Sequence, residues 1–411
     1  MTIENNLASP HGDRPPLRRD NQQWLLDYMI KTTGKAQHFQ TDGRGDLPKG
    51  VRSHAMISKH LGHRAAGYER LATNEERLGH QETAMDFYFL AANSYAAAQH
   101  TVLAINDEKR FLSVGLRRSY DRVSALAPYR LEHVSIPWNG QNVYGNLHIN
   151  PDVQGPAPLI FHIPGCDVTK ESWPHPHFNQ AHQRGMHVFS FDGPGQGESL
   201  INDVRLTADN YEHAAVAALD FLCNRPEIDE SKITVYATSF GSLWGIRLAI
   251  IDRRIKAVVG VQASLCEKII LTDLESPRWK QLFGFITGAE SEAHLDQIMK
   301  DMSVAGRMSE IMCPTLLTVG EYDPRSPLTE TFKLFQEITA PAALWVMADQ
   351  HHSFTVGPGE TWARGSHGVC IDWLRDRLGG VPLDSPGQVK YVDSTLGPND
   401  PNAEHKLWWF E

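Results

Sequence analysis

From about residue 129 onward, short apolar segments alternate with helical ones, and this alternation restricts the possible folds more than any other feature. The apolar segments have the length of buried strands. Parallel strands need a crossover, usually a helix, so strands that alternate with helices form mostly parallel, doubly wound sheets. We therefore predict an α/β fold with strands at 158–163, 187–191, 233–237, 257–261, 315–319 and 343–347.

A β-hairpin is predicted at the start of this region. Residues 131–137 begin an alternating stretch, and residues 143–149 have the pattern of its partner strand. The pair Asn139-Gly140 between them is a strong signal for a tight hairpin turn. In a doubly wound sheet, functional residues collect at the carboxyl ends of the strands, so candidate site residues are expected just after each strand.

The N-terminal part of the chain is predicted to be helical. Apolar residues recur at helical spacing around 24–29, from 82 to 100 and from Phe111 onward. In the second segment, one face is marked by Phe87, Leu90, Ala91, Ser94, Tyr95 and Ala98. Such a domain packs on the catalytic one, forms a cap that shapes the substrate pocket, or does both. The predicted organisation is a flexible segment at 1–20, a helical cap domain at 21–128, a catalytic domain at 129–379 and a tail at 380–411.

Charge and composition narrow the range of partners. The 411 residues carry a formal net charge of −10, which argues against nucleic acid, because such a partner favours a basic surface. The five cysteines are scattered and include no CxxC pair, which favours reduced thiols. No apolar run resembles a secretory signal or approaches the roughly 18 residues of a membrane span, so we expect a cytoplasmic protein without a membrane partner. Exposed Trp408, Trp409 and Phe410 would be costly, so they are expected to dock on the same chain or on the second subunit of a homodimer.

The segment Tyr236-Ala-Thr-Ser-Phe-Gly-Ser242 follows a predicted strand and precedes a predicted helix. A serine at such a corner is typical of a nucleophile elbow, whose usual pattern is GxSxG. Ala237 replaces the first glycine, and its small side chain meets most of the need for close backbone approach. Ser239 is thus the predicted nucleophile, and the backbone N–H of Phe240 is a predicted oxyanion donor. The alternative is a serine that only caps the helix.

A serine nucleophile needs a base, and the base needs a carboxylate that orients it. In hydrolases with such an elbow, the chain order is serine, acid, histidine. Asp323 follows the fifth predicted strand and is preferred as the acid over Glu321, which lies closer to the strand. His352 follows the sixth strand and is preferred as the base over His351, because a small residue and an aromatic one follow it. His351 is expected to line the pocket or to face water.

A glycine-containing loop follows the first of the predicted parallel strands, where a second oxyanion donor is expected. The backbone N–H of Cys166, the residue after Gly165, is the predicted donor. Asp167, Lys170 and Glu171 are expected to order this loop, and Asp167 is also a candidate pocket residue.

Four histidines follow this loop, and clustered histidines can form a metal site. They are separated by two, five and five residues, which does not match HExxH or a similar zinc-binding pattern. An adjacent pair such as the two histidines after the sixth strand does not easily chelate one ion through both rings. No metal and no cofactor is therefore predicted. The four histidines are His175, His177, His182 and His187.

Three segments together resemble the FrsA-like α/β-hydrolases. They are Pro164-Gly-Cys-Asp-Val-Thr-Lys-Glu171, Asp192-Gly-Pro-Gly-Gln-Gly-Glu-Ser199 and Phe221-Leu-Cys-Asn-Arg-Pro-Glu-Ile-Asp229. The second segment is fairly specific. Its glycines are predicted to form a tight turn and not a phosphate loop, because the G-K-[ST] ending is absent. The sequence departs from the family pattern at Ala237 and Pro164, where glycine is more usual. The resemblance implies the α/β-hydrolase fold, with a helical N-terminal part.

For function, the resemblance implies a triad of Ser239, Asp323 and His352. It also implies a small-molecule substrate that is often cleaved at a C–C bond next to a ketone, as in a β-diketone, a polyketide or an acylated aromatic compound. Glu267, just past the fourth predicted strand, is a candidate pocket acid that would assist such a cleavage. One alternative is a carboxylesterase or thioesterase with the same triad. A third hypothesis is a catalytically idle binding protein.

Overall fold

The computed structural model describes residues 31, 47–267, 271–272, 277–348, 350–352, 361–383, 387–393 and 397–398. The N-terminal segment at 1–20, the helix expected around residues 24–29 and the aromatic tail at 408–410 lie outside these residues. Within the described ranges, no helix is both long enough and apolar enough to cross a membrane.

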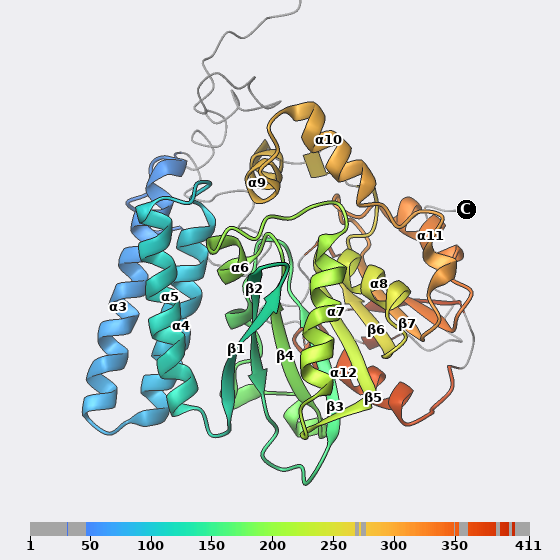
Figure 1. The fold of residues 1–411 in the computed structure, drawn as a ribbon, viewed down its shortest axis with the longest axis horizontal. Coiled ribbons are helices and arrows are strands. Elements are labelled where there is room, and N and C mark those ends of the chain that lie inside the picture. Colours follow the sequence, from blue (N-terminus) through green and yellow to red (C-terminus); the bar gives the residue numbers. More distant parts are fainter. Residues whose placement is uncertain are drawn as a thin grey trace, which may run out of the picture.

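One sheet runs through the centre of the molecule (Figure 1). Its described strands are ordered β1-β2-β4-β3-β5-β6-β7-β8-β9-β10. The pairs β1–β2, β2–β4 and β9–β10 are antiparallel, and all other neighbours are parallel. The strands are β1 (Leu131–Trp138), β2 (Gln141–His148), β3 (Ala157–Ile163), β4 (His187–Asp192), β5 (Ile228–Thr238), β6 (Ile255–Val261), β7 (Thr315–Gly320), β8 (Ala342–Met347), β9 (Gln388–Asp393) and β10 (Gly397–Pro398).

The predicted α/β fold is confirmed, and all six predicted parallel strands are present as β3 to β8. The predicted hairpin is also present as β1 and β2. Asn139 and Gly140 both have positive φ angles, of 46° and 75°, as the favoured two-residue hairpin turn requires. The sheet extends further than expected, because β9 lies in the segment predicted to be a tail and pairs with β8.

Helices cover both faces of this sheet. Successive strand residues point to opposite faces, so Val235 packs in the same cluster as Leu243 from α8, whereas Tyr236 packs with Ile371 from α12. Since both faces are covered, the central strands are apolar throughout and show no alternation. The helices after the hairpin are α6 (Gly197–Ile201), α7 (Asn210–Cys223), α8 (Gly241–Ile251), α9 (Pro277–Thr287), α10 (Glu292–Asp301), α11 (Leu328–Gln336) and α12 (Thr361–Leu378).

Three long helices form a bundle beside the β1 edge of the sheet (Figure 1). They are α3 (Ile57–Arg77), α4 (Gln81–His100) and α5 (Asp107–Leu126), and they enclose a hydrophobic cluster of their own. Ion pairs reinforce the contact between α3 and α5, for example between Arg118 and Glu69. The apolar face predicted for α4 is partly wrong, because Tyr95 is buried but Leu90 is 45% exposed. The reason is that α4 packs against both α3 and α5 and buries a wider, displaced surface.

Candidate active site

The predicted nucleophile stands at a strained corner between β5 and α8. Ser239 has a φ angle of 53°, which is rare for a residue with a side chain. Its backbone N–H donates to the carbonyl of Val261 at 2.8 Å, which fixes the corner to the end of β6. Such strain persists only where the surrounding structure imposes it, and it is typical of a nucleophile elbow.

The elbow lies against the loop that follows β3, and glycines permit the close approach. A Cβ atom on Gly241 would lie 2.5 Å from the carbonyl oxygens of both Ile163 and Pro164. A Cβ atom on Gly165 would lie 3.3 Å from Cβ of Ser239. The second glycine of the elbow motif is therefore required by its distance from the neighbouring backbone.

Ser239, His352 and Asp323 are joined by hydrogen bonds. The Oγ atom of Ser239 lies 2.8 Å from Nε2 of His352, and Nδ1 of His352 lies 2.6 Å from Oδ2 of Asp323. The backbone N–H of Arg325 donates to the other carboxylate oxygen at 2.9 Å. The acid and histidine side chains are buried, at 0% and 4% exposure, whereas Ser239 is half-buried. With Nδ1–H donating to the carboxylate, Nε2 is free to accept the serine proton.

The structure separates the two residues of each competing pair. His351 is exposed, and its Nδ1 lies 3.0 Å from the carbonyl oxygen of Tyr322 and not beside Ser239. Glu321 follows β7 directly, but the carboxylate in contact with the ring of His352 belongs to Asp323. The other predicted pocket acid, Glu267, is exposed after β6. Its proposed role stays a prediction.

The two predicted oxyanion donors both lie near the nucleophile. One is the next residue in the chain, and the other belongs to the loop that packs against the elbow. Phe240 follows Ser239 directly, and its ring packs on Trp244 and Phe283, with centroid distances of 4.9 Å to each. Cys166 is buried, one residue beyond the Gly165 that approaches Ser239. Both backbone amides thus belong to the two segments that meet at the nucleophile.

Gln196 supports the oxyanion loop, a role that the sequence analysis did not find. Its side-chain Nε2 donates to the carbonyl oxygens of Pro164 at 3.1 Å and Gly165 at 2.8 Å. The hydroxyl of Tyr211 in turn donates to Oε1 of Gln196 at 2.5 Å. The Asp192–Ser199 motif therefore does more than turn the chain, because it fixes the backbone that faces the nucleophile.

A buried charge cluster fixes the other end of this loop. The ammonium group of Lys170 lies 2.6 Å from Glu171, 2.8 Å from Glu198 and 3.2 Å from Asp192. Burial opposes the charge of Lys170, but these three carboxylates outweigh it and hold its pKa above the ordinary value. Burial also raises the pKa of Asp192, to about 6. The expectation that Lys170 and Glu171 order the loop is consistent with these contacts.

Two of the four histidines that follow the oxyanion loop contact a carboxylate from the bundle. Asp86 on α4 accepts from Nδ1 of His177 at 2.9 Å and lies 3.4 Å from Nε2 of His175. The three groups are close enough to bind one ion. However, Nδ1 of His175 accepts the backbone N–H of His177 at 3.2 Å, so its Nε2 carries the ring proton and cannot bind a metal in that tautomer. The contact of His177 is accounted for as a hydrogen bond between the bundle and the catalytic part, and His175 lies beside the same carboxylate.

The fold and the elbow define the class of protein, and comparison with a solved structure agrees. The crystal structure of 2,6-dihydroxy-pseudo-oxynicotine hydrolase superposes with a TM-score of 0.70, at 23% identity over 89% of this chain and 97% of that one. The protein has the α/β-hydrolase fold.

The family follows from the sequence comparisons. A family model described as "Esterase FrsA-like" matches residues 61–280, more than half of the chain, and the protein belongs to this family. It is similar to the hydrolase LUC6 of a Fusarium species, at 27% identity over 80% of this chain and 84% of that protein. It is also similar to the 2,6-dihydropseudooxynicotine hydrolase of Paenarthrobacter nicotinovorans, at 28% identity over 62% of this chain and 68% of that protein. The protein is therefore a hydrolase. The family match ends before Asp323 and His352, so their roles rest on geometry.

Proposed function

We propose that the protein is a serine hydrolase that cleaves a carbon–carbon bond next to a ketone, in a β-diketone, a polyketide or an acylated aromatic compound. The observation that carries the serine-hydrolase part of this proposal is the continuous hydrogen-bonded line from Asp323 through His352 to Ser239. A hydroxyl group becomes an effective nucleophile only beside such an oriented base.

The first half of the reaction forms an acyl-enzyme. Nε2 of His352 takes the proton as Oγ of Ser239 attacks the carbonyl carbon, and Asp323 stabilises the imidazolium that results. The backbone N–H groups of Cys166 and Phe240 bind the oxyanion of the tetrahedral intermediate. In the second half, water attacks the acyl-serine, with His352 again acting as the base.

A carbon–carbon bond breaks in this way only when the leaving carbanion is stabilised, for example as the enolate of a second ketone. Two observations favour such a substrate. The chain resembles a family whose members often cleave C–C bonds beside ketones. A further relative is named as a hydrolase of 20-hydroxy-prefusarin, in Gibberella moniliformis, at 25% identity over 61% of this chain.

Ester hydrolysis by the same groups is the second candidate function. Its support is the description of the matching family as esterase-like, together with the esterase FrsA of Yersinia pestis, which is 26% identical over 72% of this chain. An ester needs no enolate stabilisation because its alcohol leaves readily. The two functions therefore share the nucleophile and differ in what binds the leaving group.

The nucleophile is tested with a fluorophosphonate probe and intact-protein mass spectrometry. We expect one adduct on the wild-type protein, none on Ser239→Ala, and an undiminished adduct on Ser231→Ala, a matched change at an exposed serine. An adduct that persists in Ser239→Ala would refute the assignment.

The reaction is tested with 1-phenylbutane-1,3-dione and p-nitrophenyl acetate. A C–C hydrolase converts the diketone to a carboxylic acid and a ketone, which chromatography detects. Turnover of the ester alone, with the diketone unchanged, would replace the C–C proposal with the esterase function.

A further inference from the structure

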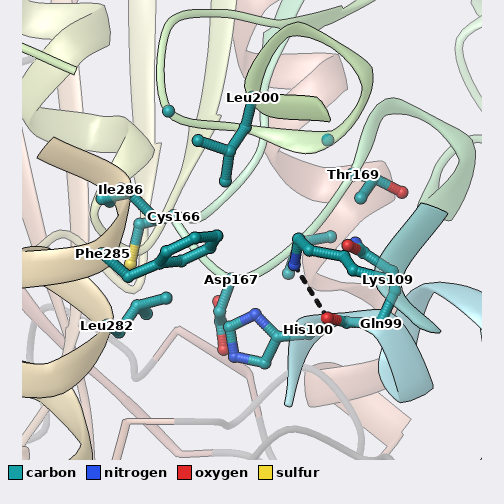
Figure 2. Close-up of a pocket in the computed structure, with 13 residues that line it drawn as sticks. Gln99, His100, Lys109, Cys166, Asp167, Thr169, Leu200, Leu282, Phe285 and Ile286 are labelled. Atoms are coloured by element: carbon teal, nitrogen blue, oxygen red, sulfur yellow. Dashed lines mark hydrogen bonds between the residues drawn. The ribbon is translucent and has the colours of Figure 1, made fainter. Parts of the chain in front are cut away.

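A small cavity lies where the helical bundle, the loop after β3 and α9 meet (Figure 2). Its volume is about 20 Å³, which is room for about one water-sized group. Its walls include Gln99, His100 and Lys109 from the bundle, Cys166 and Asp167 from the loop, and Phe285 from α9. The cavity therefore begins beside the residue proposed as an oxyanion donor.

Lys109 is the feature of this cavity that packing alone does not explain. The residue is only 3% exposed, and it lies in the first turn of α5, where the helix dipole disfavours a cation. Burial, and then the nearby charges of Arg278 and Arg205, lower the pKa of Lys109 to about 7. Among the described residues, no carboxylate pairs with it. A buried ammonium group without a carboxylate partner lowers the stability of the fold. We therefore expect this group to have a functional role.

The donors of Lys109 are only partly used. An ammonium group has three N–H donors. One donates to the carbonyl of Gln99 at 2.8 Å and another to the carbonyl of Val102 at 3.1 Å, both at the end of α4. The ring of Phe285 lies 5.1 Å away. In the described part of the chain, no acceptor receives the third N–H, and Figure 2 shows the amine turned toward the middle of the cavity.

We propose that Lys109 binds the second carbonyl oxygen of the substrate, the one on the leaving side of the scissile bond. This inference rests on the function proposed above. In a β-diketone, a single carbon separates the two carbonyl groups. Cys166 and Lys109 line the same cavity, so we assign the two oxygens of one such molecule to the amide of Cys166 and to Lys109. The cavity has room for one oxygen atom and excludes a bulkier group.

This contact would act at the step in which the C–C bond breaks. The tetrahedral intermediate collapses, and the electron pair of the C–C bond forms the carbon–carbon double bond of an enolate. The negative charge passes to the second oxygen, where the N–H of Lys109 binds it. The imidazolium of His352 then returns its proton to the enolate carbon, which releases a ketone. Water hydrolyses the acyl-serine to a carboxylic acid, so the sum is diketone plus water to acid plus ketone.

Two arginines near Lys109 favour an oxygen that gains negative charge, whereas the carboxylate of Asp167 opposes it. Arg278 on α9 donates to the carbonyl of His100 at 3.2 Å, and Arg205 lies on the loop before α7. Asp167 is the carboxylate of the cavity wall, and His100 is its titratable neighbour there. Lys109 supplies the donor that points into the cavity.

Binding of two matched esters tests the inference without requiring C–C cleavage. Phenyl 3-oxobutanoate carries two carbonyl oxygens with the spacing of a β-diketone, and phenyl butanoate lacks the second one. Their affinities are measured by titration calorimetry in a Ser239→Ala background, which prevents turnover. We expect the oxo ester to bind roughly 10- to 100-fold more tightly, the range for a hydrogen bond to a charged group. In Lys109→Met this preference should fall to within about threefold.

The control separates the donor from its structural role at the helix ends. Asn106→Ala removes the side chain that accepts the backbone N–H of Lys109 at the start of α5, but keeps the ammonium group. It should retain the preference. The preference should also decline as the pH rises through about 7, because the free ammonium group then loses its proton. A merely structural role for Lys109 would affect both esters equally at every pH.

Three results would overturn the inference: equal affinities in the parent protein, a preference that survives in Lys109→Met, or an equal loss in Asn106→Ala. Cleavage of 1-phenylbutane-1,3-dione by the protein with Ser239 intact is measured separately. If that cleavage is absent while the Lys109-dependent preference is present, the proposed function fails and the oxygen-binding site stands.

Discussion

Substitution of Lys170 tests whether the buried charge cluster supports the oxyanion loop. A pair of unit charges 2.8 Å apart attracts by about 6 kcal/mol at an effective dielectric constant of 20. Lys170 contacts three carboxylates, and desolvation of the buried charges offsets much of this attraction. Loss of one partner from a buried ion pair typically costs about 3–5 kcal/mol. We expect Lys170→Met to lower the free energy of unfolding by this amount at pH 8.

The pH dependence of this loss is the sharper part of the test. Without Lys170, the carboxylate of Asp192 loses its nearest cation, so its pKa rises further above the value of about 6 set by burial. Protonation then removes the unpaired charge, and the loss should shrink as the pH falls from 8 to 5. Urea unfolding at both pH values measures it. The control Lys232→Met removes a half-exposed partner of Asp229 and should cost under about 1 kcal/mol. A loss below about 1 kcal/mol for Lys170→Met, or a loss independent of pH, would refute this account of the cluster.

The other predictions concern single groups. Gly241→Ala should lower stability by about 1–3 kcal/mol in thermal unfolding, because its Cβ atom meets two backbone oxygens at 2.5 Å. Gln196→Leu should reduce kcat by roughly 10- to 100-fold in a steady-state ester assay, with an unchanged circular dichroism spectrum, because the oxyanion loop loses two donors. Asp323→Asn should reduce kcat by about 10⁴-fold in the same assay. Between about pH 7 and pH 10.5, the unfolded chain binds the proton that folded Lys109 has lost. The free energy of unfolding should therefore rise with pH in that window, and in Lys109→Met this contribution should be absent.

The elements that the sequence predicted are those specified by neighbouring residues. The turn at Asn139 depends on a dipeptide, and the corner at Ser239 depends on a strand, a small residue and a helix that follow one another in the chain. The order of nucleophile, acid and base could be used because the acid and the base each lie in the loop that follows a strand. The distances that join His352 to its two partners could come only from the structure.

The features that sequence analysis missed depend on contacts between distant segments. Gln196 lies within a motif that the sequence analysis recognised, but its role there was missed. The carbonyl oxygens that accept its hydrogen bonds lie about thirty residues earlier in the chain. Asp86 reaches His177 across the junction of the bundle and the catalytic part. Lys109 is buried at the start of a helix, where a cation is unfavourable. No local sequence pattern predicts this burial. From the sequence alone, a lysine in the first turn of a helix is expected to face solvent, and only the packing of α9 shows that it is buried.

The capping of α4 has a consequence for how this scaffold could change its substrate. Lys109 and Arg278 both donate to backbone carbonyls at the end of α4, so a side chain from α5 and one from α9 are fixed to the same turn. The hydrogen bonds that join Ser239, His352 and Asp323 form between loops that follow other strands. None of them involves the end of α4. Mutational drift at the α4 turn can therefore change how the second substrate oxygen is held without breaking the hydrogen bonds that activate Ser239. Choice of leaving group and activation of the nucleophile can evolve at different rates in this protein.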